Sequence, residues 1–158
     1  MPNSFSTETE GAALVAARGQ VMALAARATP DELASALDAL GRPDWSDVRR
    51  PETGLVMLRG RTGGDGAPFN FGEATVTRAA VRVGDSGPVG LSYILGRDVA
   101  RARAAATIDA LWQSGRHDEV EAVLLGPVRA RLAAEDAAAA ARTAATRVDF
   151  FTMVRGED

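Results

Sequence analysis

Hydrophobic and polar positions divide the chain into a central stretch with strand character and two helical flanks. Residues 52–95 contain three runs rich in β-branched and aromatic residues, separated by clusters of glycine, proline and aspartate. Such runs with turn-forming residues between them predict an antiparallel β-meander. We place its strands at 55–62, 74–83 and 89–95, and expect a short strand or an extended link over 42–51 that leads into the first of them.

Two helices are predicted before the meander. Over residues 9–28, apolar side chains recur at alternating spacings of three and four, which indicates a helix with a narrow apolar stripe. That stripe consists of Leu14, Ala17, Val21, Leu24 and Ala28. Thr29, Pro30 and Glu32 match a capping box at the start of a second helix. Its apolar face is Leu33, Leu37 and Leu40, and Gly41 with Pro43 ends it.

Three helices are predicted after the meander. Asp98 is expected to cap a helix that packs on the sheet. The apolar face of that helix is Ala104, Ala105, Ile108, Leu111 and Trp112. A shorter helix over 117–125 follows, then a break at Gly126-Pro127, then an alanine-rich helix from 128 to about 146. The pattern predicts one α+β domain over residues 1–158.

The C-terminal tail carries four large apolar side chains within five residues: Phe150, Phe151, Met153 and Val154. Burying one such side chain is worth about 1.5–3 kcal/mol, so the group is too costly to leave in water. We expect the tail either to pair with its own sheet or to lie on a partner chain, and we take these four residues as candidates for a partner interface.

Composition removes several classes of chemistry. All 18 basic residues are arginine and there is no cysteine, which excludes disulfides, thiolate metal sites and lysine nucleophiles or bases. The formal net charge of -3 argues against a general nucleic-acid binder. Neither a leader pattern nor an apolar run of membrane-spanning length is present, so we expect a cytoplasmic protein without a membrane partner.

Arginines on the predicted strands are the main candidates for a binding site. Because alternate side chains of a strand share a face, Arg59 and Arg61 point together, and so do Arg78 and Arg82. If the two strands pair with these faces aligned, up to four guanidinium groups lie on one surface and need an anion or an acidic partner. The alternative is a set of separate solvated charges. The acidic residues that would partly neutralise them are Glu52, Glu73 and Asp85.

Two further arginines flank the predicted helix start at Asp98. Arg97 could add to an anion site, because helix N-termini attract negative charge. Arg101 lies in the first turn, where a cation is slightly unfavourable, and so indicates an anion or a carboxylate from another element.

Other candidate sites favour structural interpretations. The glycine-rich loop after Arg61 matches neither G-x-x-x-x-G-K nor G-x-G-x-x-G, and no helix follows it, so we interpret it as a hairpin loop rather than a phosphate site. His117 is the only histidine. A catalytic triad or a two-histidine metal site is therefore hard to build, and we expect a capping or surface role for it. We predict no catalytic residue and no metal ligand in this chain.

Several strings of residues resemble the PhnG family, the G subunits of the bacterial carbon-phosphorus lyase system. They are ETGLV (52–56), RGRTGGDG (59–66), GEATVTRAAVR (72–82), GRD (96–98) and RVDFFTMVRG (147–156). The resemblance extends over residues 29–157 in order, and the tail string is the most specific part of it. Residues 1–19 carry little of it, which implies a variable or flexible N-terminal extension.

The resemblance implies a subunit without catalytic residues of its own inside an enzyme, a transferase. With the H and I subunits, and an L subunit in the reaction, that enzyme makes α-D-ribose 1-methylphosphonate 5-triphosphate from ATP, with Mg²⁺, and methylphosphonate, and releases adenine. The core complex also contains the J subunit, a radical-S-adenosylmethionine enzyme. The resemblance implies no cofactor in this chain, and an isolated chain that is inactive.

Two other functions stay open. The chain could be a free-standing arginine-lined binder of phosphonate or nucleotide. It could also be a hydrolase that uses Glu73, Asp98 or His117, although no base and nucleophile pair can be identified.

Overall fold

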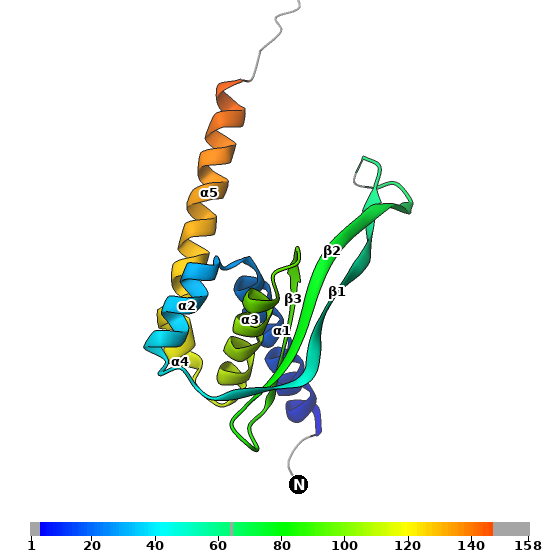
Figure 1. Cartoon of the computed structure of the whole chain (residues 1–158). Coiled ribbons are helices and arrows are strands. Elements are labelled where there is room, and N and C mark those ends of the chain that lie inside the picture. Colours follow the sequence, from blue (N-terminus) through cyan, green and yellow to red (C-terminus); the bar gives the residue numbers. More distant parts are fainter. Residues whose placement is uncertain (1–3, 64, 147–158) are drawn as a thin grey trace, which may run out of the picture.

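The computed structural model describes residues 4–63 and 65–146, and its centre is a three-stranded antiparallel sheet (Figure 1). The strands β1 (Trp45–Arg61), β2 (Pro68–Val83) and β3 (Val89–Leu95) lie in the order β1-β2-β3. The predicted meander and the α+β class are confirmed. The first two strands begin earlier than the sequence indicated, because β1 and β2 pair along their whole length, from Trp45 opposite Val83 to Arg61 opposite Pro68.

Two helices precede the sheet in the chain, and the other helical segments follow it. They are α1 (Ser4–Arg27), α2 (Pro30–Ala39), α3 (Val99–Gln113), α4 (His117–Val120), the π-helical segment η1 (Glu121–Leu125) and α5 (Gly126–Ala145).

Helix α3 lies between the sheet and the other helices. It lies against β2 and β3 on one side and against α1, α2 and α4 on the other (Figure 1). Because it is covered from both sides, its buried positions form an unbroken run from Ala105 to Trp112 rather than a single stripe. The face predicted from the sequence is buried, except that Ala104 is half-buried. Asp98 caps the helix as predicted, and its Oδ1 accepts from the backbone N–H of Arg101 at 2.9 Å.

The capping box at the start of α2 is present as predicted. The backbone N–H of Glu32 donates to Thr29 Oγ1 at 3.2 Å, and the backbone N–H of Thr29 donates to Glu32 Oε2 at 2.7 Å. Gly41, with φ of 85°, ends the helix as expected. The stripe predicted on α1 is right at Val21 and Ala28 but wrong at Leu14, which is 56% exposed. Residues 11–16 are all exposed, because α1 extends beyond the elements on which it packs.

Arg101 does not hold an anion or a carboxylate from another element, contrary to expectation. Its Nε donates to the carbonyl oxygen of Ala28 at 2.9 Å, and its Nη2 donates to that of Ala26 at 2.7 Å. These carbonyls lie at the C-terminal end of α1, where the last turn of a helix leaves acceptors without intrahelical donors. The Arg101 guanidinium lies in the first turn of α3, and it caps the C-terminal end of α1.

Glu32 also joins α2 to α5, since Arg131 donates from Nε to Glu32 Oε1 at 2.7 Å and from Nη2 to Oε2 at 3.0 Å. The Arg131 guanidinium holds the pKa of Glu32 below its ordinary value of 4.5. A carboxylate whose pKa is lower in the folded state than in the unfolded state stabilises the fold. This contribution is complete at pH values above the unfolded-state pKa and is lost as the pH falls through the folded-state pKa.

Glu32→Gln is therefore expected to lower the free energy of unfolding near pH 7 and to flatten its dependence on pH below about 4.5. The measurement is urea unfolding at a series of pH values. Glu135→Gln is the matched control, because Glu135 also accepts from Arg131 but its side chain is 57% exposed, and exposed ion pairs contribute little. Equal slopes for wild type and Glu32→Gln would contradict the prediction.

The expected break at Gly126-Pro127 is wrong, because helical structure continues from His117 to Ala145. Pro127 has no N–H, and its ring would clash with a carbonyl one turn back in a regular α-helix. The π-helical segment η1 precedes it, and the N–H of Gly126 donates to Glu121 O, five residues back. The wider π turn thus accommodates the proline without ending the helix.

Two parts of the chain project from the core on the same side (Figure 1). One is the outer half of the β1-β2 hairpin, residues 55–61 and 68–74, which we call the hairpin arm. The other is the end of α5, residues 133–146, in which every residue is exposed. Among the described residues, no helix combines the length and the apolar character needed to cross a membrane.

Candidate functional site

The structure separates the four strand arginines that the sequence suggested could converge. Arg59 and Arg61 lie opposite Asn70 and Pro68 at the end of the hairpin arm, whereas Arg78 lies opposite Glu52. Eight residues of β2 separate position 70 from position 78, about 26 Å at roughly 3.3 Å per residue. The guanidinium groups therefore do not share one surface, and the role of each in binding an anion or a partner stays a prediction.

Arg78 has its own counterion on the sheet. Its Nε donates to Glu52 Oε2 at 3.1 Å, its Nη2 donates to the same oxygen, and Arg49 Nη2 lies 3.3 Å from Glu52 Oε1. The hydrogen bonds that Arg78 donates to Glu52 lower the pKa of Glu52 and raise the pKa of Arg78. Neutralisation by Glu52 was one of the alternatives that the sequence left open.

Arg61 and Arg82 each donate a hydrogen bond to the loop that follows their own strand. Arg61 Nη1 donates to the carbonyl of Gly66 at 3.1 Å, and Arg82 Nη1 donates to that of Gly87 at 2.9 Å. Arg97 is exposed beside Asp98, at the start of α3. Phe150, Phe151, Met153 and Val154 lie outside the described residues.

The outer face of the sheet, opposite α3, carries exposed apolar side chains. Leu91, Tyr93 and Leu95 of β3 point to this side, and Tyr93 lies opposite Arg78. A shallow hollow of about 100 Å³ is lined by residues of all three strands. They are Arg49, Arg50, Arg78, Ala79, Ala80, Leu91 and Tyr93. Aromatic and arginine side chains around an apolar surface are typical of protein interfaces.

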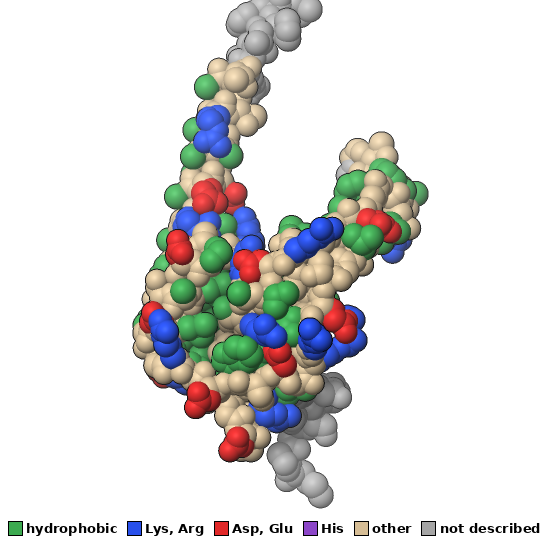
Figure 2. Space-filling model, viewed as in Figure 1, with side chains coloured by type: hydrophobic (Ala, Val, Ile, Leu, Met, Phe, Trp, Pro, Cys, Tyr) green, Lys and Arg blue, Asp and Glu red, His purple; other side chains and the backbone are tan. Residues whose placement is uncertain are grey.

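The hairpin arm is the second exposed apolar surface, visible as green side chains on the projecting strands (Figure 2). Its exposed large residues are Leu55, Val56, Met57, Phe69 and Phe71. The rings of Phe69 and Phe71 lie 6.2 Å apart. Phe71 is an extra residue at a shift in register, and its ring lies over Gly60, where a Cβ would come within 3.2 Å of it. A two-stranded ribbon exposed on both faces gains little stability alone.

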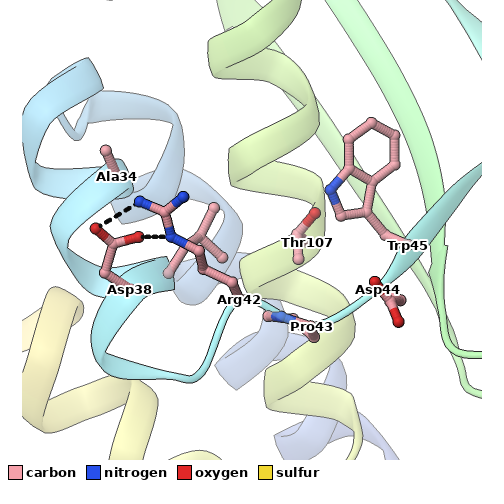
Figure 3. Close-up of a pocket in the computed structure, with 8 residues that line it drawn as sticks. Ala34, Asp38, Arg42, Pro43, Asp44, Trp45 and Thr107 are labelled. Carbon is pink, nitrogen blue, oxygen red and sulfur yellow. Dashed lines mark hydrogen bonds and ion pairs between the residues drawn. The ribbon is translucent and has the colours of Figure 1, made fainter.

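An open hollow of about 480 Å³ lies between α2, α3 and the start of β1 (Figure 3). Asp38 and Arg42 line one side, and Trp45 and Thr107 line the other. The Arg42 guanidinium points toward Asp38 rather than into the hollow, and Nη2 donates to Oδ2 at 2.9 Å. This hydrogen-bonded pair neutralises the cation, so the hollow presents no free positive charge from Arg42 to an anionic ligand.

Trp45 at the rim of this hollow is held by α3. The Arg103 guanidinium lies 5.6 Å from the centre of the indole ring, within the range of a cation–π contact. Arg103 also donates from Nε to Asp47 Oδ1 at 3.0 Å. No pattern in the sequence predicted this cluster, because Trp45 and Asp47 belong to β1 and Arg103 belongs to α3.

A buried acid, Asp109, is the polar group that sequence reasoning missed most completely. Its side chain is fully buried, and Arg18 of α1 donates to both of its oxygens, from Nε at 3.0 Å and from Nη2 at 2.8 Å. The backbone N–H of Leu91 donates to Oδ2 at 2.8 Å. Asp109 thus joins α1, α3 and β3. All of its contacts are structural, and we assign it no catalytic role.

His117 has the surface role that was predicted. It begins α4, is exposed, and its ring stacks on Trp112 with the ring centres 4.3 Å apart. In the described part of the chain, no group of three or more histidine, cysteine, aspartate or glutamate side chains is arranged to hold a metal ion.

Comparison with known proteins places this geometry in a family. Residues 16–156 match the family described as phosphonate metabolism protein PhnG. The chain is 56% identical over 154 residues to the alpha-D-ribose 1-methylphosphonate 5-triphosphate synthase subunit PhnG of Rhizobium meliloti (strain 1021), which covers 97% of this chain and 98% of that protein. Such identity over nearly the full length of both chains leaves one conclusion: this chain belongs to the PhnG family.

Proposed function

We propose that this chain is a subunit of α-D-ribose 1-methylphosphonate 5-triphosphate synthase and acts in phosphonate metabolism as part of a multi-subunit enzyme. The observation that carries the proposal is the 56% identity to the Rhizobium meliloti subunit over nearly the whole of both chains. At that identity the fold and its surfaces are retained together.

The proposal extends to the reaction and its partners. The enzyme uses ATP with Mg²⁺ and methylphosphonate, and releases adenine. Its partners are the H, I and J subunits of the carbon-phosphorus lyase core complex and the L subunit in the reaction. A cytoplasmic location belongs to the same proposal, since ATP is the expected nucleotide substrate.

Within that enzyme, the chain completes or shapes a site whose reactive groups lie in other subunits. The contacts of its polar side chains support this assignment. Asp109 is saturated by Arg18 and Leu91, Arg78 is paired with Glu52, and His117 is stacked on Trp112. By contrast, the outer sheet face and the hairpin arm expose apolar side chains of the kind that subunit interfaces bury.

The test is co-expression of this chain with the H, I, J and L subunits, followed by size-exclusion chromatography and an assay of adenine release from ATP and methylphosphonate. We expect this chain to co-elute with its partners and adenine release to require it. Adenine release by preparations that lack the chain would contradict a necessary role. Turnover by the isolated chain would favour a hydrolase, and tight binding of ATP or methylphosphonate to it in calorimetry would favour a free-standing binder.

A further inference from the structure

The free edge of β1 is built to receive another strand. Because the strand order is β1-β2-β3, β1 lies at one edge of the sheet, and its outward N–H and C=O groups have no strand partner among the described residues. Edge strands are normally protected by charges, prolines or covering side chains, since an unprotected edge is a template for another chain. Residues 53–58 of β1, TGLVML, contain neither a charge nor a proline. We call residues 53–58 the edge segment.

The opposite edge of the same sheet is protected, which makes the contrast informative. On β3, the N–H of Leu91 donates to Asp109 Oδ2 at 2.8 Å, and the carbonyl of Val89 accepts from Gln113 Nε2 at 2.9 Å. Side chains of α3 thus satisfy outward backbone groups of β3. The edge segment of β1 has no such side-chain caps within the described chain.

The side chains of the edge segment also suit strand addition. Leu55 is 63% exposed and Met57 is 53% exposed, so an added strand would cover apolar side chains. At Gly54 no atom lies within 4 Å of the position that a Cβ would occupy. Glycine within a strand weakens the strand but often marks a place where another backbone approaches closely.

Charge at the two ends of the edge segment defines the chemistry of the incoming strand. Arg49 and Arg50 precede the segment, and Arg59 and Arg61 follow it. Glu52 is a carboxylate beside these arginines at the start of the segment, and it is shared between Arg78 and Arg49. The edge therefore carries a positive charge, although the net charge of the chain is -3. A complementary strand is apolar in its middle and carries carboxylates toward its ends.

A second copy of this chain does not meet that requirement. Antiparallel pairing of two edge segments about a twofold axis between Leu55 and Val56 would place Arg50 of each copy opposite Arg61 of the other. Like charges directly opposite each other destabilise a strand pair, and the Glu52–Arg59 pairs of the same register would only offset this repulsion. A strand of a different chain with carboxylates toward both of its ends matches the four flanking arginines better than a second copy does.

We propose that the edge segment of β1 binds an extended segment of another subunit by β-strand addition, and that this segment is apolar in its middle and acidic at its ends. The inference rests on the proposed function, because it names the surface by which this chain joins its complex. Backbone hydrogen bonds would provide affinity in this mode, and the flanking arginines would select the acidic strand.

Hydrogen exchange measured on the isolated full chain and on the co-purified complex tests the proposal. Alternate amides of the edge segment are expected to exchange at least about tenfold more slowly in the complex. The Leu91 amide is the internal control, since Asp109 already accepts from it in the isolated chain.

A pair of variants tests the same surface through affinity. Leu55→Asp is expected to weaken binding of the partner subunits at least about tenfold, the effect of losing one buried apolar side chain and adding a charge. Val15→Asp is the matched control, because Val15 is an apolar residue of α1 that is 73% exposed, and it should leave affinity unchanged.

The outcomes separate this inference from the proposed function. If the complex assembles and releases adenine while the edge segment exchanges equally fast in both states, strand addition is wrong and the proposed function stands. Slow exchange of the edge segment in the isolated chain would overturn the inference as well. If this protection persists when the chain is diluted, another part of the same chain covers the edge. If the protection is lost on dilution, a second copy of the chain covers it. Failure of the wild-type chain to join any complex would overturn both.

Discussion

Replacing Gly90 with alanine is expected to destabilise the fold by about 3 kcal/mol or more, at or above the upper end of typical overpacking costs. A Cβ at Gly90 would lie 1.9 Å from the carbonyl oxygen of Ala106 and 2.6 Å from the backbone nitrogen of Ala110. Both atoms belong to the backbone of α3, so no side chain can rotate to make room. The helix would have to move away from β3, which would open the core on both sides.

The measurement is the midpoint and free energy of urea unfolding, with hydrogen exchange of α3 as a local readout. Gly72→Ala is the matched control, because Gly72 is also in the sheet and has nothing within 4 Å of its Cβ position. Alanine there is expected to leave stability unchanged or to raise it by up to about 1 kcal/mol, since glycine loses more conformational freedom on folding. If both variants unfold at the same denaturant concentration as wild type, the close packing of α3 on β3 is not the constraint that the structure indicates.

Replacing Asp109 with alanine is expected to cost about 3–5 kcal/mol, the usual effect of removing one member of a buried ion pair. The variant would leave the Leu91 N–H without its acceptor and the Arg18 guanidinium without its counterion. Arg18 is 31% exposed and can recover some hydration, so the unpaired N–H and the space left around it account for much of the loss. Thermal and denaturant unfolding measure the effect.

Asp38→Ala is the control for Asp109→Ala. Asp38 also pairs with an arginine, Arg42, but both side chains are more than half exposed, at 51% and 76%. Its loss is expected to change stability far less than the loss of Asp109, because exposed ion pairs contribute little. Arg18→Met tests the same network from the other side, and it should also be strongly destabilising, because it leaves the fully buried Asp109 carboxylate without its counterion. A cost for Asp109→Ala no larger than that for Asp38→Ala would contradict the structural role assigned here.

Local signals predicted the helices and turns well, because they act between residues close in the chain. The capping box at Thr29 and the N-cap at Asp98 depend on contacts within a few residues, and both are confirmed. The bounds of β3 are also as predicted, because turn-forming residues flank it in the chain. The break assigned to Gly126-Pro127 failed for a local reason too. A π turn can absorb a proline, and no sequence pattern distinguished this outcome from a helix end.

The extent of β1 could not be predicted from its own residues. Its first part, WSDVRRPETG, contains charges and a proline and lacks the alternation of a half-buried strand. It is a strand because β2 pairs with it, and its burial pattern is almost uniformly exposed because no layer covers it. Alternation in a strand reflects burial on one face, so a ribbon exposed on both faces carries no such signal.

The sequence by itself determined the α+β class, the meander, the helix caps and the family, since each depends on residue order or on neighbouring residues. Only the tertiary structure decided what the charged side chains do. Arg18 meets Asp109 across 91 positions, Arg101 caps a helix 73 positions earlier, and Arg59 is kept from Arg78 by strand register. Ion pairs and caps of this kind depend on which elements pack together, and packing is a property of the whole chain rather than of any segment.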